Sequence, residues 1–499
     1  MAALLAIAAP AIGGTAGGDV LQAQIRKTYP SLVYVDRYRA TFPREAQGVG
    51  VFWAPNAPPP DASRVGGLVR ALVQLEDQHV ALAGASAGGT ETLGALFRTA
   101  TDGSVVVWRV FDPAAEALKE GDRIDAIDGV PVRAWLRRTA ELTFGGNRRG
   151  RYAEAATELG LAAAVVHRVA GLGPSVRLLV APVGRPAHSI SLHYLAVDRA
   201  RAVALSRALD RTDLPRSFVA AGYRIGTVRI GAFAPQYDPA FVAASDAAAR
   251  GGADDDRAML AGYCAVVSSF AARFDAAAQT SDAVLVDLRG NLGGFGREAR
   301  LMADAIDARK ASRTFDVFAT GRPGIVRLRE QPVDSPCHHA TQRRPILVLD
   351  DAATRSSGEL MTTWLWSAGA RVIGEHTVGA GGGFAFGSDG FALPGSSYRI
   401  RTSGNFTFFD ASGLLRDGDW NEQRLVDIVS SAEFRPSLKH PFAIQSVGFR
   451  PDVTIATAAA DLRDGGGGEV ARALAAMERR GTSPVRPSRS AEAPARSRR

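Results

Sequence analysis

Residues 346–360 read ILVLDDAATRSSGEL, an apolar run followed by a polar turn and the start of a second apolar run. The first run, 346–349, is typical of a buried strand, and residues 358–366 predict a helix. Ser356 then lies at the corner between strand and helix, where a hydroxyl can be exposed. The amide of Ser357 lies at the helix N-terminus, where the helix dipole favours negative charge. Taken alone, the stretch also fits a helix that Ser356 caps, with Glu359 completing a capping box.

Two similar stretches flank this one in the sequence. Residues 283–294 read AVLVDLRGNLGG, a strand that leads into a glycine turn, and residues 370–383 read ARVIGEHTVGAGGG, a second strand that leads into a glycine loop. A glycine turn lets backbone amides face a ligand, so Gly293 or Gly294 could contribute to an oxyanion hole. With a further apolar run at 225–230 and a helical pattern at 297–306, the alternation predicts an α/β layered core.

The region before this core has a different pattern. Residues 105–110 (VVVWRV), a short helix near Pro113, a glycine turn at Gly121 and a strand before Asp128-Gly129 resemble a PDZ domain. Strands at 176–183 and 189–194 would complete that domain and leave 139–173 as an insertion. The insertion fits a tolerated loop or small helical subdomain, and gating of substrate is the alternative.

Together, the three stretches resemble the clan of C-terminal-processing and tricorn serine peptidases, the tail-specific protease family. The pattern of that clan is a strand into a glycine turn, a Ser-x-x-Glu turn and a Gly-Glu-x-Thr-x-Gly turn, with a PDZ-like domain upstream. The resemblance implies a crotonase/ClpP-like layered protease core with an inserted PDZ-like β domain and an N-terminal helical domain. It places Ser356 at the nucleophile, and the amides of Ser357 and of Gly293 or Gly294 at the oxyanion hole.

The general base separates the two branches of the clan. The processing proteases use a lysine in the last glycine turn, where this chain has Ala380, and none of its four lysines lies in such a motif. The other branch, which includes tricorn and the chlamydial protease-like activity factor, uses a histidine upstream of the PDZ-like domain. The stretch LEDQH at residues 75–79 is similar to that position, so the resemblance implies His79 as the base, an imidazole that titrates near neutrality. The loop at 379–384 looks closest to the chlamydial subgroup.

The chain departs from this branch at the residue that orients the histidine. The branch has a glutamate shortly before a glycine and a proline, whereas this chain has Gln445 in QSVGFRPD, residues 445–452. A neutral amide can fix the tautomer of an imidazole, but it stabilises an imidazolium less than a carboxylate does. We therefore expect either low activity with Gln445 as the third catalytic residue, or a charge supplied by Glu76 or Asp77.

Composition and the resemblance together imply the domain boundaries. We expect a candidate signal segment at 1–18, a helical domain at 19–85, the PDZ-like domain at 86–200, the peptidase core at 201–467 and a basic, disordered tail at 468–499. The apolar start predicts export to the periplasm or the exterior of a bacterial cell, without stable insertion in a membrane. Of the net charge of +8, the stretch 479–499 supplies +6, from seven arginines and one glutamate. Nucleic-acid binding is therefore not expected of the folded body.

The two cysteines, Cys264 and Cys337, allow one disulfide if the compartment is oxidising. Cys337, His338 and His339 do not have the spacing of a zinc site, so neither a metal nor a cofactor is expected. Protein or peptide substrates are the expected partners, and a homodimer is left open. Two alternatives remain: a non-catalytic peptide- or ligand-binding protein on the same fold, and a crotonase-like acyl-CoA enzyme, which needs no serine nucleophile.

Overall fold

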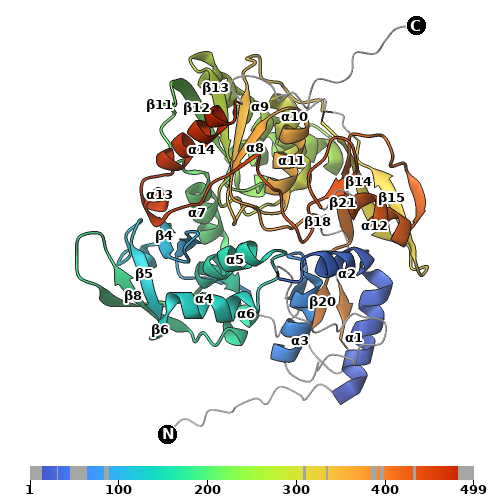
Figure 1. Cartoon of the computed structure of the whole chain (residues 1–499), viewed down its shortest axis with the longest axis horizontal. Helices are drawn as coiled ribbons and strands as arrows, with labels where there is room; N and C mark the ends of the chain where they lie inside the picture. Colours follow the sequence, from blue (N-terminus) through green and yellow to red (C-terminus); the bar gives the residue numbers. More distant parts are fainter. Residues whose placement is uncertain are drawn as a thin grey trace.

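The computed structural model describes residues 14–30, 32–44, 65–83, 89–306, 311–332, 335–383, 390–393, 398–430 and 434–481 (Figure 1). Residues 1–13 and 482–499 lie outside this part of the chain. The predicted signal segment up to residue 13 and most of the predicted tail therefore stay predictions.

The central sheet contains the four strands predicted for the core. Its order is β11 (Ser217–Ala220), β12 (Tyr223–Arg229), β13 (Ala283–Asp287), β16 (Ile346–Asp350), β17 (Arg371–Gly374) and β24 (Val453–Thr454). The strands from β12 to β24 are parallel, and β11 pairs antiparallel with β12. Parallel strands end at the same edge, so the turns that follow β13, β16 and β17 meet there.

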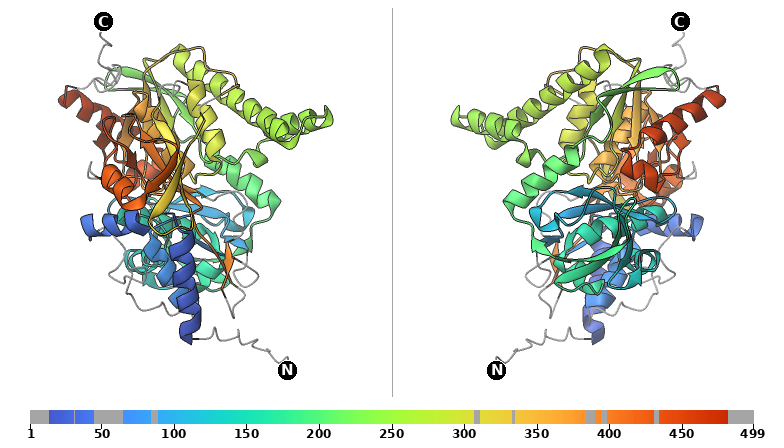
Figure 2. Two further views of the ribbon diagram at one scale, coloured as in Figure 1. Left: turned by 90° about the vertical axis from the view of Figure 1, so that its right-hand side faces the viewer. Right: turned by 90° about the vertical axis from the view of Figure 1, so that its left-hand side faces the viewer.

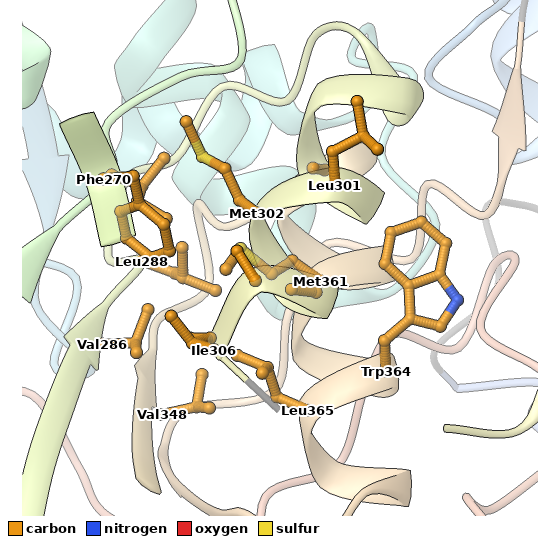
Figure 3. Close-up of a cluster of buried hydrophobic side chains, with 14 of the residues drawn as sticks. Phe270, Val286, Leu288, Leu301, Met302, Ile306, Val348, Met361, Trp364 and Leu365 are labelled. Atoms are coloured by element: carbon orange, nitrogen blue, oxygen red, sulfur yellow. The ribbon is translucent and has the colours of Figure 1, made fainter. Parts of the chain in front are cut away.

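Helices cover both faces of this sheet. Alternate residues of the strands face α9 (Asp255–Gln279), α10 (Gly296–Ile306) and α11 (Ser357–Ser367) on one side, where Val286, Val348 and Trp364 pack together (Figure 3). The intervening residues pack against α14 (Gly467–Arg479) on the other side. Helix α8 (Pro239–Arg250) buries no residue and extends with α9 as an arm from the body (Figure 2).

Helix α14 corrects the predicted boundary of the tail. Val470, Ala473, Leu474 and Met477 of this helix are buried against the central sheet. The apolar spacing of three to four residues makes one face of this stretch hydrophobic. The core therefore extends to about residue 479, past a short helix α13 (Ala459–Arg463), and the basic charge lies beyond it.

The N-terminal helices share a hydrophobic core with a second sheet. Helices α1 (Gly14–Thr28), α2 (Leu32–Thr41) and α3 (Val65–Leu72) pack on an antiparallel sheet of order β18 (Gly382–Gly383), β21 (Asn405–Asp410), β14 (Arg313–Ala319), β15 (Ile325–Glu330) and β22 (Gly418–Asn421). Strand β23 (Phe442–Ala443) pairs with β21, and α12 (Glu422–Ser430) contacts α2. The helical character predicted for 19–85 is present, but these helices have no core of their own.

The chain between the N-terminal helices and the core forms a third sheet. Its order is β3 (Ala95–Thr99), β4 (Val105–Val110), β5 (Arg123–Ile127), β8 (Ser175–Ala181) and β9 (His188–His193), with β6 (Val130–Pro131) beside β5. A helical turn (Pro113–Ala115) lies where the sequence predicts a short helix, whereas α4 (Val132–Ala140) has no counterpart among the predicted elements. That this unit is a PDZ domain stays a prediction.

The predicted insertion is mostly helical. It contains α5 (Arg148–Gly160), β7 (Leu161–Ala163) and α6 (Ala164–Val169), and β7 forms a small sheet with β2 (Thr90–Thr92) and β10 (Leu195–Ala196). Helix α5 is buried along most of its length, and α7 (Arg199–Asp210) then leads into the central sheet. In the described part of the chain, no helix has the length and apolarity needed to span a membrane.

Candidate active site

Ser356 lies at the corner between β16 and α11, as the sequence predicts. Its φ of 52° and ψ of −122° are rarely adopted by a residue with a side chain, a strained conformation that is typical of functional turns. The hydroxyl makes no capping hydrogen bond to the helix and instead lies 3.0 Å from Nε2 of His79. The turn therefore exposes the hydroxyl to an imidazole.

Asp77 lies next to the imidazole of His79. Glu76 ends the 3₁₀ turn Val73–Leu75 with a φ of 52°, which directs the chain back on itself. Oδ1 of Asp77 accepts the His79 amide at 2.9 Å and lies 3.4 Å from Nδ1 of the imidazole. Oδ2 of Asp77 accepts the Tyr29 hydroxyl at 2.9 Å. Burial acts to raise the pKa of Asp77, but the hydrogen bonds and the charge of His79 outweigh it and hold this pKa below its ordinary value.

Gln445 is buried close to this pair but has other partners. Its Oε1 accepts the amide of Gly382 at 2.9 Å, and its Nε2 donates to the carbonyl of Glu76 at 3.0 Å. Both polar ends of the side chain are thus bound to backbone groups. The carboxylate of Glu76 pairs instead with Arg39, whose Nε lies 3.7 Å from it. Of the three residues considered for orienting His79, the structure places Asp77 against Nδ1 and Gln445 behind the Glu76 turn.

The first glycine turn lies directly against Ser356. A Cβ added to Gly293, whose φ is 76°, would lie 2.6 Å from Cβ of Ser356, and one added to Gly294 would lie 1.9 Å from the carbonyl oxygen of Phe233. The amide of Gly293 donates to Oδ1 of Asn291 at 2.8 Å. The amides of Gly294 and Ser357 donate to no acceptor in the part of the chain that the structure describes.

Glu359 joins the serine turn to the third glycine loop. Its carboxylate accepts the amide of Ser356 at 3.0 Å, the hydroxyl of Thr377 at 2.5 Å and the amides of Gly379 and Ala380 at 2.7 Å. Burial raises the pKa of Glu359 to about 7, against the opposing effect of these donors. Ala380, at the position of the lysine in the other branch, is buried in this loop.

A groove of about 2840 Å³ opens beside these residues. His79, Ser356, Ser357, Gly293 and Gly294 all line it. Peptide-sized ligands fit a groove of this volume. Among the described residues, no group of three or more His, Cys, Asp or Glu side chains is arranged to hold a metal ion.

A protein-family model matches the region of the chain that contains Ser356. Residues 225–388 match the family model of Peptidase family S41. This segment is about a third of the chain and includes both glycine turns and Ser356. The resemblance predicted from the sequence is confirmed, and the family match assigns the chain to the serine-type peptidases. His79, Asp77 and Gln445 lie outside the matched segment, so their arrangement rests on the geometry alone.

Solved structures with similar folds cover nearly the whole chain. Mature CPAF complexed with lactacystin has 13% sequence identity and a TM-score of 0.59, with 93% of this chain and 98% of that chain covered. A structure of mature CPAF gives the same identity and TM-score over 95% and 99%. The photosystem II D1 C-terminal processing protease has 14% identity and a TM-score of 0.42 over 89% and 93%. The CPAF likeness shows a common fold. No protein with a curated description matches the chain.

Proposed function

We propose that the chain is a serine endopeptidase in which Ser356 is the nucleophile, His79 the general base and Asp77 the residue that orients the base. The observation that carries this proposal is the 3.0 Å separation of Ser356 Oγ and His79 Nε2 at a strained turn that lines an open groove. In space, the nucleophile lies next to the base and the base next to the orienting carboxylate, which is the arrangement that covalent acyl transfer requires.

The reaction starts when Ser356 Oγ attacks the carbonyl carbon of a peptide bound in the groove. Nε2 of His79 takes the hydroxyl proton and returns it to the leaving amine, a role that accounts for about 10² to 10⁴ in rate. The imidazolium formed in this step faces the carboxylate of Asp77, which stabilises its charge. Water then hydrolyses the acyl-enzyme with His79 again as base.

The oxyanion is held by backbone amides in this proposal. The amides of Gly294 and Ser357 are the better pair, because the amide of Gly293 already donates to Asn291. Ser357 opens helix α11, so the helix dipole adds to the donation from its amide. The hydroxyl of Ser357 donates to the Gly294 carbonyl at 2.8 Å, which ties the two proposed donors to each other.

We propose protein or peptide substrates and export from the cytoplasm. The disulfide between Cys264 and Cys337 supports export, since such bonds persist in oxidising compartments. The groove supports an extended substrate because it continues from the serine turn to β18, a short edge strand of the second sheet. A homodimer and a PDZ-like recognition unit stay expectations from the sequence.

Hydrolysis of casein tests the proposal. New peptide termini are counted for the wild type, Ser356→Ala, His79→Ala and, as a matched control, His188→Ala, an exposed histidine of β9. We expect cleavage by the wild type and the control, and none by the first two variants. A wild type that neither cleaves casein nor reacts with a fluorophosphonate would favour the alternative of a non-catalytic binding protein.

A further inference from the structure

Helix α5 contacts three of the segments that surround the proposed active site. Its N-cap residue, Asn147, donates from Nδ2 to the carbonyls of Thr377 at 2.5 Å and Val378 at 3.2 Å, within the third glycine loop. Two residues on, Arg149 makes two hydrogen bonds to Glu375, at 3.2 and 3.1 Å. The helix predicted as part of an insertion is therefore attached to the catalytic loops.

Glu154, in the middle of α5, connects the other two segments. A single oxygen of its carboxylate, Oε2, accepts Nε2 of Gln78 at 2.6 Å and pairs with the guanidinium of Arg355. Gln78 immediately precedes His79, and Arg355 immediately precedes Ser356. Arg355 also donates from Nε to the carbonyl of Leu292 at 3.2 Å, beside the first glycine turn.

The base and the nucleophile need such a connection. They are 277 residues apart in the sequence, and the segments that carry them pack in different hydrophobic clusters. Their relative position is therefore not set by one local backbone. Since a misplacement of 1 Å can cost about 10² in rate, the spacing of the two segments is a catalytic requirement.

A contribution to stability does not by itself explain why the buried side chain at position 154 is a glutamate. Glu154 is 3% exposed, and its second oxygen, Oε1, is buried and has no hydrogen-bond partner among the described residues. Burial raises its pKa despite the opposing effects of Arg355 and Gln78. Because buried ion pairs often add little net stability over apolar residues of similar volume, a carboxylate here is better explained by the geometry it enforces.

We propose that Glu154 is a positioning residue that holds the Gln78-His79 and Arg355-Ser356 pairs at the separation needed for proton transfer, so that α5 is part of the catalytic assembly. This inference rests on the proposed function. Glu154 acts through Gln78 and Arg355, and the proposed role requires no contact between Glu154 and the substrate.

The test compares Glu154→Leu with Glu141→Leu, which changes an exposed glutamate at the end of helix α4 that is not among the residues lining the groove. The readouts are kcat, KM, the second-order rate of inactivation by a fluorophosphonate and the thermal midpoint. For Glu154→Leu we expect kcat and the inactivation rate to fall together by about 10²-fold, with KM within threefold of the wild type. For Glu141→Leu we expect all values within twofold.

Two further variants cover the case that Glu154→Leu does not fold. Gln78→Met removes one of the two connections and is expected to lower kcat by about tenfold without changing KM. The double variant Glu154→Leu/Gln78→Met should be no slower than Glu154→Leu, since the single change already removes the bond to Gln78.

The outcomes separate the inference from the proposed function. A folded Glu154→Leu or Gln78→Met that reacts at the wild-type rate, or a change confined to KM, overturns the positioning role and leaves the peptidase intact. A wild type that does not react with the fluorophosphonate overturns the proposed function, and the inference with it.

Discussion

Replacing Asp77 by asparagine should cost the enzyme most of its activity. Oδ1 of Asp77 lies 3.4 Å from Nδ1 of His79, and both side chains are at least 90% buried. At an effective dielectric constant of about 20, two unit charges at this distance interact by about 5 kcal/mol. Because the imidazolium forms only during the reaction, this energy belongs to the transition state and corresponds to roughly three to four orders of magnitude in kcat. An asparagine would also place its NH₂ group opposite one of the groups that now donate a hydrogen bond to Asp77.

The assay is kcat on a peptide substrate, with the rate of inactivation by a fluorophosphonate as a second measure. Tyr29→Phe is the matched control, because it removes the hydrogen bond to Oδ2 of Asp77 and leaves the charge, so we expect a loss of less than tenfold. Gln445→Glu should give no gain. It replaces the donor to the Glu76 carbonyl by an oxygen, at a cost of about 1–3 kcal/mol in stability. The reasoning is refuted if Asp77→Asn stays within tenfold of the wild type, or if Gln445→Glu raises kcat.

Three other predictions concern the disulfide, the oxyanion turn and Glu359. Replacing Cys264 and Cys337 by serine opens a loop of 73 residues and should lower the free energy of unfolding by about 4 kcal/mol, measured by urea denaturation; a midpoint insensitive to reductant would contradict it. Gly294→Ala should reduce kcat by about 10² to 10³, because its Cβ would meet the Phe233 carbonyl at 1.9 Å, whereas Gly413→Ala, also at positive φ but with nothing within 4 Å, should leave kcat unchanged. Glu359, whose pKa burial raises to about 7, stays protonated in the native state over a range where the unfolded chain has ionised. Stability should therefore fall by up to about 3 kcal/mol as pH rises from about 4.5 to 7, and a Glu359→Gln variant with the same pH dependence of unfolding would rule this out.

Much of the core was predictable because its signals are local. The apolar runs that form β12, β13, β16 and β17 are each followed by a turn, which the glycines or the serine in the sequence indicate. The position of Ser356 between β16 and α11 follows from that pattern alone. The antiparallel sheet of β14, β15, β21 and β22 has no comparable signal, because its strands pair across as many as 97 residues of intervening sequence.

The partner of His79 could not be chosen from the sequence. Gln445 occupies the position that the resemblance assigns to an acid, whereas Asp77 is only two residues from the histidine it faces. That contact depends on the left-handed conformation of Glu76, and a glutamate gives no sequence signal for a positive φ. The role of α5 was equally hidden, since Glu154 and Asn147 act on segments that are distant in the sequence.

The three turns of the clan pattern form one mechanical unit in this structure. The strained φ of Ser356 costs energy and persists only if its surroundings enforce it. Glu359, three residues on, enforces it by accepting the Ser356 amide, and the same carboxylate is fixed by Thr377, Gly379 and Ala380 of the third turn. On the other side, a Cβ at Gly293 would lie 2.6 Å from Cβ of Ser356, so the glycine leaves room for the serine against the first turn. We therefore expect a change in any one turn to release the strain at Ser356, because the glutamate, the threonine and the glycines together hold the backbone of this corner.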